Sequence, residues 1–260
     1  MRITVLCEDT CARDGFCAEH GLSLYIETNT HRILFDMGQS EVFAQNARAL
    51  GIDLSAVDVA VLSHGHYDHG GGLSAFLRLN KKADVYVNEN AFGDYYSSPE
   101  KYIGLDKSLR DEPRVKLTGE YTKIADGVEL FACNEREKHV PVCAFGLTER
   151  ENGTHAADRF LHEQYLLLDG KILISGCSHK GILNIVKWLP AKHVVGGFHF
   201  VKLDPAAAEG RAALDAAAKA LNETQTDFYT CHCTGVPQFE YLKKKMPRLA
   251  YLSVGDVLEL

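Results

Sequence analysis

The sequence lacks long apolar runs, an excess of basic residues and any repeat of fixed period. No uninterrupted apolar stretch approaches the roughly 18 residues that a membrane span needs, so we expect no such span. Lysine and arginine number 28 against 35 acidic residues, and the net charge of −7 offers no basic field to a polyanion. The sequence therefore disfavours a general nucleic-acid binder. Its 46% hydrophobic and 24% charged residues predict a soluble globular protein.

Cysteine pairs at CxxC spacing are also missing, although the chain contains eight cysteines. Cys7, Cys11 and Cys17 lack the spacing of a zinc knuckle or an iron–sulfur site, and we expect them to be small buried side chains. Met1 leads within two residues into a strand-like segment rather than into the apolar core of a signal peptide. The sequence therefore predicts a cytoplasmic protein with reduced cysteines.

The order of apolar and polar residues predicts strands that alternate with helices. Strands are expected at 2–7, 22–28, 32–36, 57–62, 165–168, 172–175, 193–197 and 227–231, and helices at 40–50, 180–189, 205–221 and 235–245. In the clearest helix, Asp204 is expected to cap the N-terminus and Pro205 to take the first helical position. This alternation is typical of an α/β protein with helices packed on sheets. Because no linker divides the chain, we expect one domain spanning 1–260 with a variable insert at about 90–163.

The residues that carry chemistry gather directly after the buried strand at 57–62. His64, His66, Asp68 and His69 follow within a short segment that also contains four glycines. Imidazole and carboxylate groups are common metal ligands, and glycines allow the backbone to turn them toward one point. A loop without metal would need no such cluster. The sequence therefore predicts a metal site here.

This cluster carries a resemblance to a known family. Together with segment 34–38, which contains Asp36, the motif H-x-H-x-D-H at 64–69 resembles the signature of the metallo-β-lactamase-fold hydrolases. The similarity continues through segments 176–181, 196–199 and 231–235 and covers nearly the whole chain apart from the insert. The combined pattern is similar to the branch labelled dihydropterin-ribofuranosylaminobenzene-phosphate synthase-like. The resemblance implies a four-layer αββα sandwich with metals on loops at one edge of the two sheets.

The resemblance also implies which residues hold the metals. His64 and His66 would bind one divalent ion and Asp68 and His69 a second, while Asp36 would orient a ligand from behind. His232 matches the last histidine of the family pattern. Zinc, iron and manganese all accept such ligands, so one or two divalent ions of unspecified identity are expected.

The sequence departs from the family pattern at Gly176-Cys177, where many members have glycine followed by a bridging aspartate. Either Cys177 is a thiolate ligand or His179 supplies the coordination. We favour His179 and expect Cys177 to pack or to support the ligands. The family's remaining histidine is ambiguous; the candidates, each expected at the surface, are His139, His155 and His162.

Two further residues have candidate roles in binding or catalysis. His199 is expected on the metal side, as a ligand, as a proton donor to the leaving group or as a histidine satisfied by its neighbours. Lys180 is expected to open a helix, where backbone N–H groups and its ammonium would together hold an anion. The alternative for Lys180 is an ordinary solvated lysine.

The function that these residues predict is metal-dependent hydrolysis. A metal-bound hydroxide would attack a phosphoester or a phosphorylated pterin-like or aromatic small molecule, with Asp68 steering the water and Lys180 or His199 binding the substrate's charge. The expected partner is thus a small anionic substrate, and a homo-oligomer is left open. Alternatives are a non-haem iron dioxygenase of the same fold, a cysteine hydrolase using Cys177, and a non-catalytic metal or ligand sensor.

Overall fold

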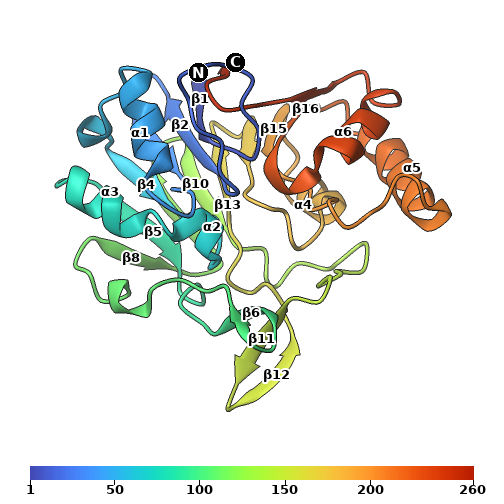
Figure 1. Cartoon of the computed structure of the whole chain (residues 1–260), viewed down its shortest axis with the longest axis horizontal. Helices are drawn as coiled ribbons and strands as arrows, with labels where there is room; N and C mark the ends of the chain where they lie inside the picture. The colour runs from blue at the N-terminus through green and yellow to red at the C-terminus, as the bar shows by residue number, and fades with distance from the viewer. The chain divides into compact units, whose positions relative to one another are not determined.

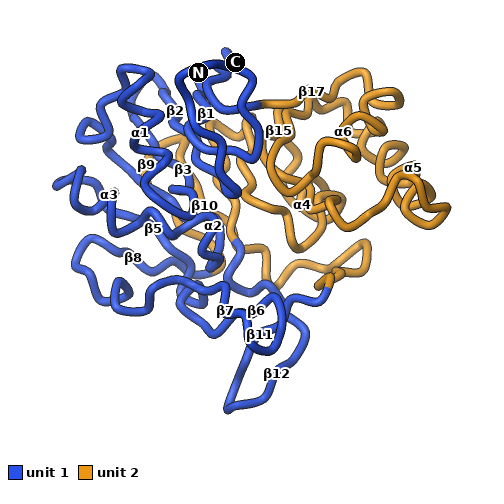
Figure 2. The backbone as a smooth tube through the Cα atoms, viewed as in Figure 1, with its two compact units in different colours: residues 1–119, 146–163, 253–260 blue, residues 120–145, 164–252 orange.

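The computed structural model describes residues 1–260 and divides them between two units. Unit 1 comprises residues 1–119, 146–163 and 253–260, and unit 2 comprises residues 120–145 and 164–252 (Figure 2). The insert predicted at about 90–163 spans both units, because residues 120–145 belong to unit 2 and residues 90–119 and 146–163 belong to unit 1.

Unit 1 is built on a seven-stranded sheet with the order β18-β1-β2-β3-β4-β5-β8 (Figure 1). Its strands are β1 (Arg2–Cys7), β2 (Ser23–Glu27), β3 (Arg32–Phe35), β4 (Val59–Val61), β5 (Asp84–Asn88), β8 (Val115–Thr118) and β18 (Val257–Glu259). Pairing is antiparallel from β18 to β3 and parallel from β3 to β8. A smaller antiparallel sheet has the order β12-β11-β6-β7 and consists of β6 (Tyr95–Ser98), β7 (Lys101–Tyr102), β11 (Thr148–Glu151) and β12 (Thr154–Ala157).

The helices of unit 1 are short, and all except η2 contribute buried residues. They are α1 (Val42–Ala49), α2 (Tyr67–Gly70), α3 (Leu73–Leu79) and the 3₁₀ helices η1 (Leu54–Ala56) and η2 (Lys107–Leu109). Phe43 and Ala47, four residues apart on α1, share a core with Leu34 and Ala60 of the sheet. Ser40, which lies before α1, accepts a hydrogen bond from the backbone N–H of Val42 (3.2 Å).

Unit 2 repeats this plan with the sheet order β17-β16-β15-β14-β13-β10-β9. Its strands are β9 (Tyr121–Ala125), β10 (Val128–Phe131), β13 (Tyr165–Leu168), β14 (Ile172–Ile174), β15 (His193–Gly196), β16 (Asp227–Thr230) and β17 (Leu249–Tyr251). Its helices are α4 (Ile182–Trp188), α5 (Ala208–Asn222), α6 (Val236–Lys243) and the 3₁₀ helix η3 (His232–Thr234). Pairing is parallel from β14 to β17 and antiparallel from β14 to β9. None of the helices in either unit combines the length and apolar character that crossing a membrane requires.

Every strand and helix expected from the sequence is present, with ends shifted by up to three residues. The expected cap of α5 is wrong, because the helix begins at Ala208 and Asp204 instead closes a turn before it, accepting the N–H of Ala206 (2.8 Å). The burial expected of the first three cysteines holds for Cys7 alone, since Cys11 is half-buried and Cys17 is exposed. All eight cysteines are free thiols.

One buried amide organises a long loop of unit 2. The side chain of Asn184, on α4, is fully buried, and its Oδ1 accepts the backbone N–H groups of His139 (2.8 Å) and Val140 (2.9 Å). Its Nδ2 donates to the carbonyl oxygens of Val140 (3.0 Å) and Lys180 (2.7 Å). One turn later, the indole of Trp188 donates to Glu137 O (2.7 Å). The loop at 137–140 is therefore held on α4 by side-chain hydrogen bonds.

We expect Asn184→Ala to lower the free energy of unfolding of unit 2 by about 2–3 kcal/mol, because several backbone groups lose their partner. Trp188 is the only tryptophan of the chain, so its fluorescence during urea denaturation reports on this unit. The matched control is Asn222→Ala at the exposed end of α5, which should change the same quantity by about 0.5 kcal/mol or less. Equal effects of the two substitutions would contradict this account of Asn184.

Candidate metal centre

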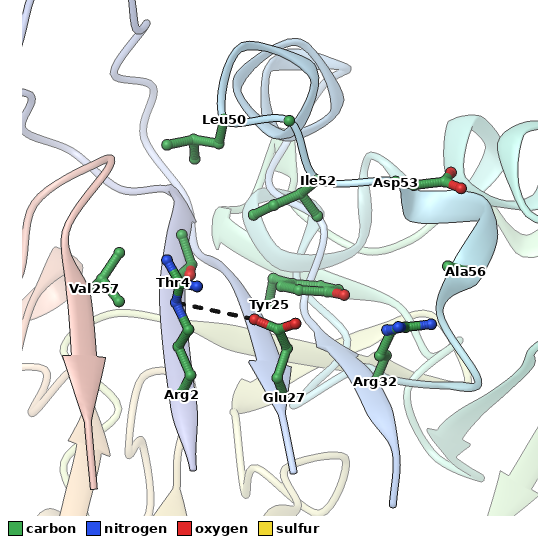
Figure 3. A pocket seen from close by; sticks show the side chains of 11 residues that line it. Arg2, Thr4, Tyr25, Glu27, Arg32, Leu50, Ile52, Asp53, Ala56 and Val257 are labelled. Atoms are coloured by element: carbon green, nitrogen blue, oxygen red, sulfur yellow. Dashed lines mark ion pairs between the residues drawn. The ribbon is translucent and has the colours of Figure 1, made fainter. Parts of the chain in front are cut away.

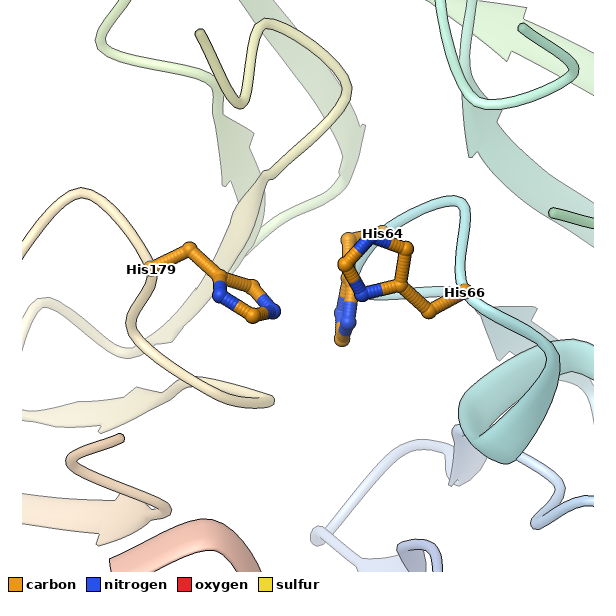
Figure 4. A group of neighbouring side chains, drawn as sticks. All are labelled: His64, His66 and His179. Carbon is orange, nitrogen blue, oxygen red and sulfur yellow. The ribbon is translucent and has the colours of Figure 1, made fainter. Parts of the chain in front are cut away.

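Two adjacent parallel strands of unit 1 deliver the predicted ligands. Asp36 directly follows β3, and the segment from Ser63 to His69 follows β4, which is the parallel neighbour of β3. Because the carboxyl ends of parallel strands meet at one edge of a sheet, these residues come together there. Figure 4 shows His64 beside His66, and their ring centroids lie 4.6 Å apart. The ring centroid of His69 lies 4.1 Å from that of His64. All three histidines are buried.

The carboxylate of Asp36 is the hydrogen-bonding centre of this cluster. It is fully buried, and its Oδ1 accepts the backbone N–H of Ser63 (2.7 Å) while its Oδ2 accepts the hydroxyl of Ser63 (2.7 Å). The same Oδ2 lies 2.7 Å from Nδ1 of His69. The oxygen of Ser63 in turn lies 2.8 Å from Nδ1 of His64. Asp36 thus contacts one histidine directly and a second through Ser63.

These contacts fix the tautomers of both rings. An ionised Asp36 only accepts hydrogen bonds, so Nδ1 of His69 carries the proton. Since the hydroxyl of Ser63 donates to Asp36, its oxygen accepts from Nδ1 of His64. In both rings the lone pair therefore lies on Nε2, which is the state in which a neutral imidazole binds a metal.

The carboxylate of Asp68 lies at the more open side of the cluster. Its Oδ2 is 3.7 Å from Nε2 of His69 and 3.4 Å from Nε2 of His20, an exposed histidine that also contacts Asp9 (3.0 Å). The sequence interpretation missed His20, because it lies far along the chain from the histidine motif and has no motif of its own. Asp68 is therefore flanked by imidazole groups on two sides.

The sequence interpretation also missed Asp158 and misplaced His162. His162 is fully buried rather than at the surface, with its ring centroid 5.0 Å from that of His66. Its Nδ1 accepts the backbone N–H of Gly65 (3.0 Å), and its Nε2 lies 3.2 Å from Oδ2 of Asp158. Nδ1 acts as an acceptor, so Nε2 carries the proton and donates to Asp158. His162 therefore positions the loop and the carboxylate.

Asp158 is held in its charged form beside His66. The two side chains are buried, with Asp158 Oδ2 3.8 Å from Nε2 of His66. Burial raises the pKa of Asp158, but the hydrogen bond from His162 and the neighbouring imidazole of His66 outweigh it and hold the pKa well below the ordinary value. The other two candidates for the family's remaining histidine differ from His162: His139 is exposed, and His155 is half-buried on β12.

Unit 2 has its own group of functional side chains, again on loops that follow parallel strands. Cys177 and His179 lie after β14, His199 after β15, and His232 and Cys233 after β16. Figure 4 also draws His179, on the loop between β14 and α4. The rings of His179 and His199 have centroids 4.3 Å apart, and His179 and His232 are buried. The predicted ligands of unit 2 are thus gathered at the carboxyl edge of its sheet.

The thiol of Cys233 is buried beside Cys177 and His199. Its sulfur lies 3.4 Å from the carbonyl oxygen of Cys177. Burial raises the pKa of Cys233, but hydrogen bonds from Cys177 and His199 and the neighbouring imidazoles outweigh it, so the pKa lies well below the ordinary value.

The structure corrects the expected setting of Lys180. The helix begins only at Ile182, and the Lys180 side chain is 1% exposed. Its ammonium donates to the carbonyl oxygen of Ala132 (2.7 Å) and to Oδ1 of Asn134 (2.6 Å). The lysine is neither solvated nor at a helix start, and these contacts give it a structural role in unit 2.

The residues of unit 1 fit a divalent metal by their chemistry. His66, Asp158 and His162 have ligand atoms within 4.8 Å of one another and are buried. Of these, His66 offers an imidazole to a metal, as His64 and His69 do through Nε2, and Asp68 adds a carboxylate. Imidazole and carboxylate together suit zinc, iron and manganese.

Unit 1 also has a second cavity, which is lined by charged side chains but by no histidine. Figure 3 shows this cavity, of about 490 Å³, with Arg2, Tyr25, Glu27, Arg32 and Asp53 among its lining. Arg2 and Glu27 form an ion pair across it at 4.0 Å. No histidine or cysteine lines the cavity, so it is not part of the candidate metal centre.

The sequence model of the metallo-beta-lactamase superfamily matches residues 18–220. The chain is 30% identical over 265 residues to 7,8-dihydropterin-6-methyl-4-(beta-D-ribofuranosyl)-aminobenzene-5'-phosphate synthase of Methanocaldococcus jannaschii, which covers 90% of this chain and 88% of the relative. It is also 34% identical over 204 residues to the uncharacterized protein MJ0448 of the same organism, covering 74% and 77% of the two chains.

Solved structures give the same result. Tm1679, described as a metal-dependent hydrolase of the beta-lactamase superfamily, matches with a TM-score of 0.81 and 33% identity over 100% of this chain and 99% of that chain. A diphosphatase from the PhnP family matches with a TM-score of 0.55 and 15% identity over 100% and 97%, a likeness of fold alone. These findings confirm the predicted family resemblance and the predicted αββα fold class.

We expect Asp36→Asn to weaken metal binding by about 10- to 100-fold, the usual effect of losing a partner that orients a metal-binding histidine. An amide cannot accept from both Ser63 and His69 with the strength of a carboxylate. The affinity is measured by competition with a chromophoric chelator. Asp53→Asn, at an exposed cap of η1, is the control and should bind metal like the wild type. Unchanged affinity in Asp36→Asn would show that the contact with His69 does not tune the site.

Proposed function

Because the chain belongs to the metallo-beta-lactamase superfamily, we propose that it is a metal-dependent hydrolase that cleaves a phosphoester in a small aromatic molecule. The observation that carries the proposal is the histidine cluster of unit 1. There Asp36 and Ser63 hold two imidazole rings in the tautomer that carries its lone pair on Nε2, the form in which imidazole binds a metal. A bound divalent metal supplies Lewis acidity and lowers the pKa of its water to about 7.

Side chains of unit 1 would orient the water, accept its proton and position the ligands. Asp68 lies at the open side of the cluster, between His69 and His20, and its carboxylate is the group suited to orient the attacking water and accept a proton from it. His162 and Asp158 would keep His66 and the backbone of Gly65 in place. No side-chain nucleophile is then required.

Two observations support a phosphorylated aromatic substrate. The relative from Methanocaldococcus jannaschii is named for a product that contains a dihydropterin, an aminobenzene ring and a phosphate. Unit 1 also has a hollow of about 560 Å³ whose lining includes Phe92, Tyr95 and Arg110, and Tyr95 is the lining residue that links it to the histidine cluster. The ring of Tyr95 has its centroid 4.0 Å from that of His162 and 5.9 Å from that of His66.

The charges of this hollow suggest how an anion would bind. Three of its basic side chains already form ion pairs, since Lys107 and Arg150 share Asp94 and Arg159 pairs with Glu149. Arg110 lines the same hollow and forms no ion pair. A guanidinium binds phosphate through two parallel hydrogen bonds, so Arg110 is the residue we assign to the substrate's phosphate.

The competing functions fit the observations less well. A dioxygenase needs two histidines and one carboxylate that face one iron, and the group of His66, Asp158 and His162 has that composition. However, both ring nitrogens of His162 are already engaged by Gly65 and Asp158. A cysteine hydrolase needs an accessible nucleophile, whereas the side chain of Cys177 is 2% exposed.

The central test is turnover of a chromogenic phosphodiester by the purified chain with added Zn²⁺ or Mn²⁺, with and without a chelator. We expect activity that the chelator abolishes and that His66→Ala and Asp68→Ala each reduce by at least about 100-fold, because each removes a direct ligand or the proton acceptor. His139→Ala, at an exposed histidine, should keep wild-type activity. Full activity in either site variant would refute the site, and activity that survives the chelator would refute the mechanism.

Inhibition by inorganic phosphate tests the binding of the substrate's charge. We expect Arg110→Ala to raise the inhibition constant by about 10-fold, the equivalent of one exposed charge-assisted hydrogen-bond pair. Lys180→Met should leave the constant unchanged, because the ammonium is held by Ala132 and Asn134. The constants are measured at fixed ionic strength. If only Lys180→Met raised the inhibition constant, Lys180 rather than Arg110 would bind the phosphate. Absence of phosphate inhibition would contradict a phosphoester substrate.

A further inference from the structure

Three side chains of unit 2 form a second cluster with a different chemical character. The sulfur atoms of Cys177 and Cys233 and a ring nitrogen of His199 all lie within 4.8 Å of one another. Both cysteines are buried, at 2% and 5% exposure, and His199 is half-buried. Cys177 and Cys233 are both free thiols.

The cluster depends on three separate loops. Cys177 follows β14, His199 follows β15 and Cys233 follows β16, three consecutive strands of the parallel part of the sheet. Residues that far apart along the chain meet because each loop leaves the same edge. Each of these loops contains a residue with a strained backbone: Ser178, one residue after Cys177, has a φ of 59°, His199 itself has a φ of 54°, and His232, one residue before Cys233, has a φ of 49°. Such strain is typical of functional sites.

The backbone also makes room for the thiol of Cys233. A Cβ atom at Gly197 would lie 2.4 Å from that sulfur, so only glycine permits the present position of Cys233. The hydroxyl of Thr234, the next residue, accepts the N–H of Phe198 (2.8 Å), which ties the loop after β16 to the loop after β15. The backbone of the loops after β15 and β16 therefore holds Cys233 close to His199.

The imidazole of His199 has an unused polar atom. Its Nδ1 is buried and has no hydrogen-bond partner. A buried nitrogen without a partner costs about 1–3 kcal/mol in a folded protein, and one explanation of such an atom is a ligand that the structure does not contain. Here the unused atom belongs to the residue that faces two thiols.

We propose that Cys177, Cys233 and His199 form a binding site for one thiophilic metal ion, Zn²⁺ or Cu⁺, in unit 2. Two thiolates and one imidazole are soft and borderline ligands that select these ions over the hard ions that carboxylates prefer. For zinc they leave a fourth position for water or another ligand. Both cysteines bind Zn²⁺ as thiolates, so their two negative charges balance the charge of the ion. The proposal gives Cys177 a ligand role in place of the packing role that the sequence favoured, and it does not depend on hydrolase activity.

The test is cobalt spectroscopy of the whole chain, reduced and freed of metal. Cobalt bound to thiolate gives a sulfur-to-cobalt charge-transfer band in the near ultraviolet, whereas cobalt bound only to histidine and carboxylate does not. We expect the band in the wild type and its loss in Cys177→Ser and Cys233→Ser. In His199→Ala, zinc affinity should fall by at least about 100-fold, because a direct ligand is lost. Cys143→Ser, at an exposed cysteine of the same unit, is the matched control and should retain the band.

Two further measurements separate this site from the histidine cluster and from misfolding. His66→Ala should keep the band, since the proposed ligands all belong to unit 2. X-ray absorption of the zinc-loaded wild type, which needs no variant, should detect sulfur neighbours at about 2.3 Å. The proposal is overturned if the wild type gives no band and no sulfur neighbour, if Cys233→Ser retains the band, or if the two cysteines form a disulfide that persists in the metal-loaded protein.

Discussion

The carboxylate of Asp36 is the constraint on which the arrangement of unit 1 depends. It is buried without a cationic side chain, and three donors from Ser63 and His69 compensate its charge. A buried carboxylate is tolerated only with such hydrogen bonds, so the loop after β4 must keep its course to satisfy it. The same bonds orient His64 and His69. Stability and function therefore require the same geometry at this point.

The two units place their functional residues at the same position of the fold, although the residues differ. In each, parallel strands end at one edge of a seven-stranded sheet, and the residues directly after the strands carry the chemistry. Strand interiors such as those of β4 and β14 are wholly buried and supply only packing. The edge loops can therefore vary in ligand type while the sheets stay the same, and the fold alone does not specify the reaction.

Much of this arrangement could be predicted from the sequence, and the exceptions share a cause. The histidine motif, Asp36 and the strands that hold them have strong local signals: short ligand spacing and continuous apolar runs. Asp158 was missed and His162 was expected at the surface because both join the cluster through contacts over almost one hundred residues, and the short strands around them lack periodicity. Lys180 was misplaced because local sequence does not reveal that Ala132 and Asn134 face its ammonium.

The cysteine at position 177, where many family members have an aspartate, changes the type of ligand that the loop after β14 offers to a metal. A bridging aspartate would bring a hard oxygen ligand to the loop after β14, whereas a cysteine brings a soft sulfur. That change alone would leave one buried thiol, which behaves as a small hydrophobic residue. With Cys233 and His199 within 4.8 Å, the same substitution creates a group of soft ligands in unit 2, while imidazole and carboxylate dominate in unit 1. The residue at position 177 therefore decides whether the loop after β14 offers a metal a hard or a soft ligand, while the sheet that holds the loop stays the same.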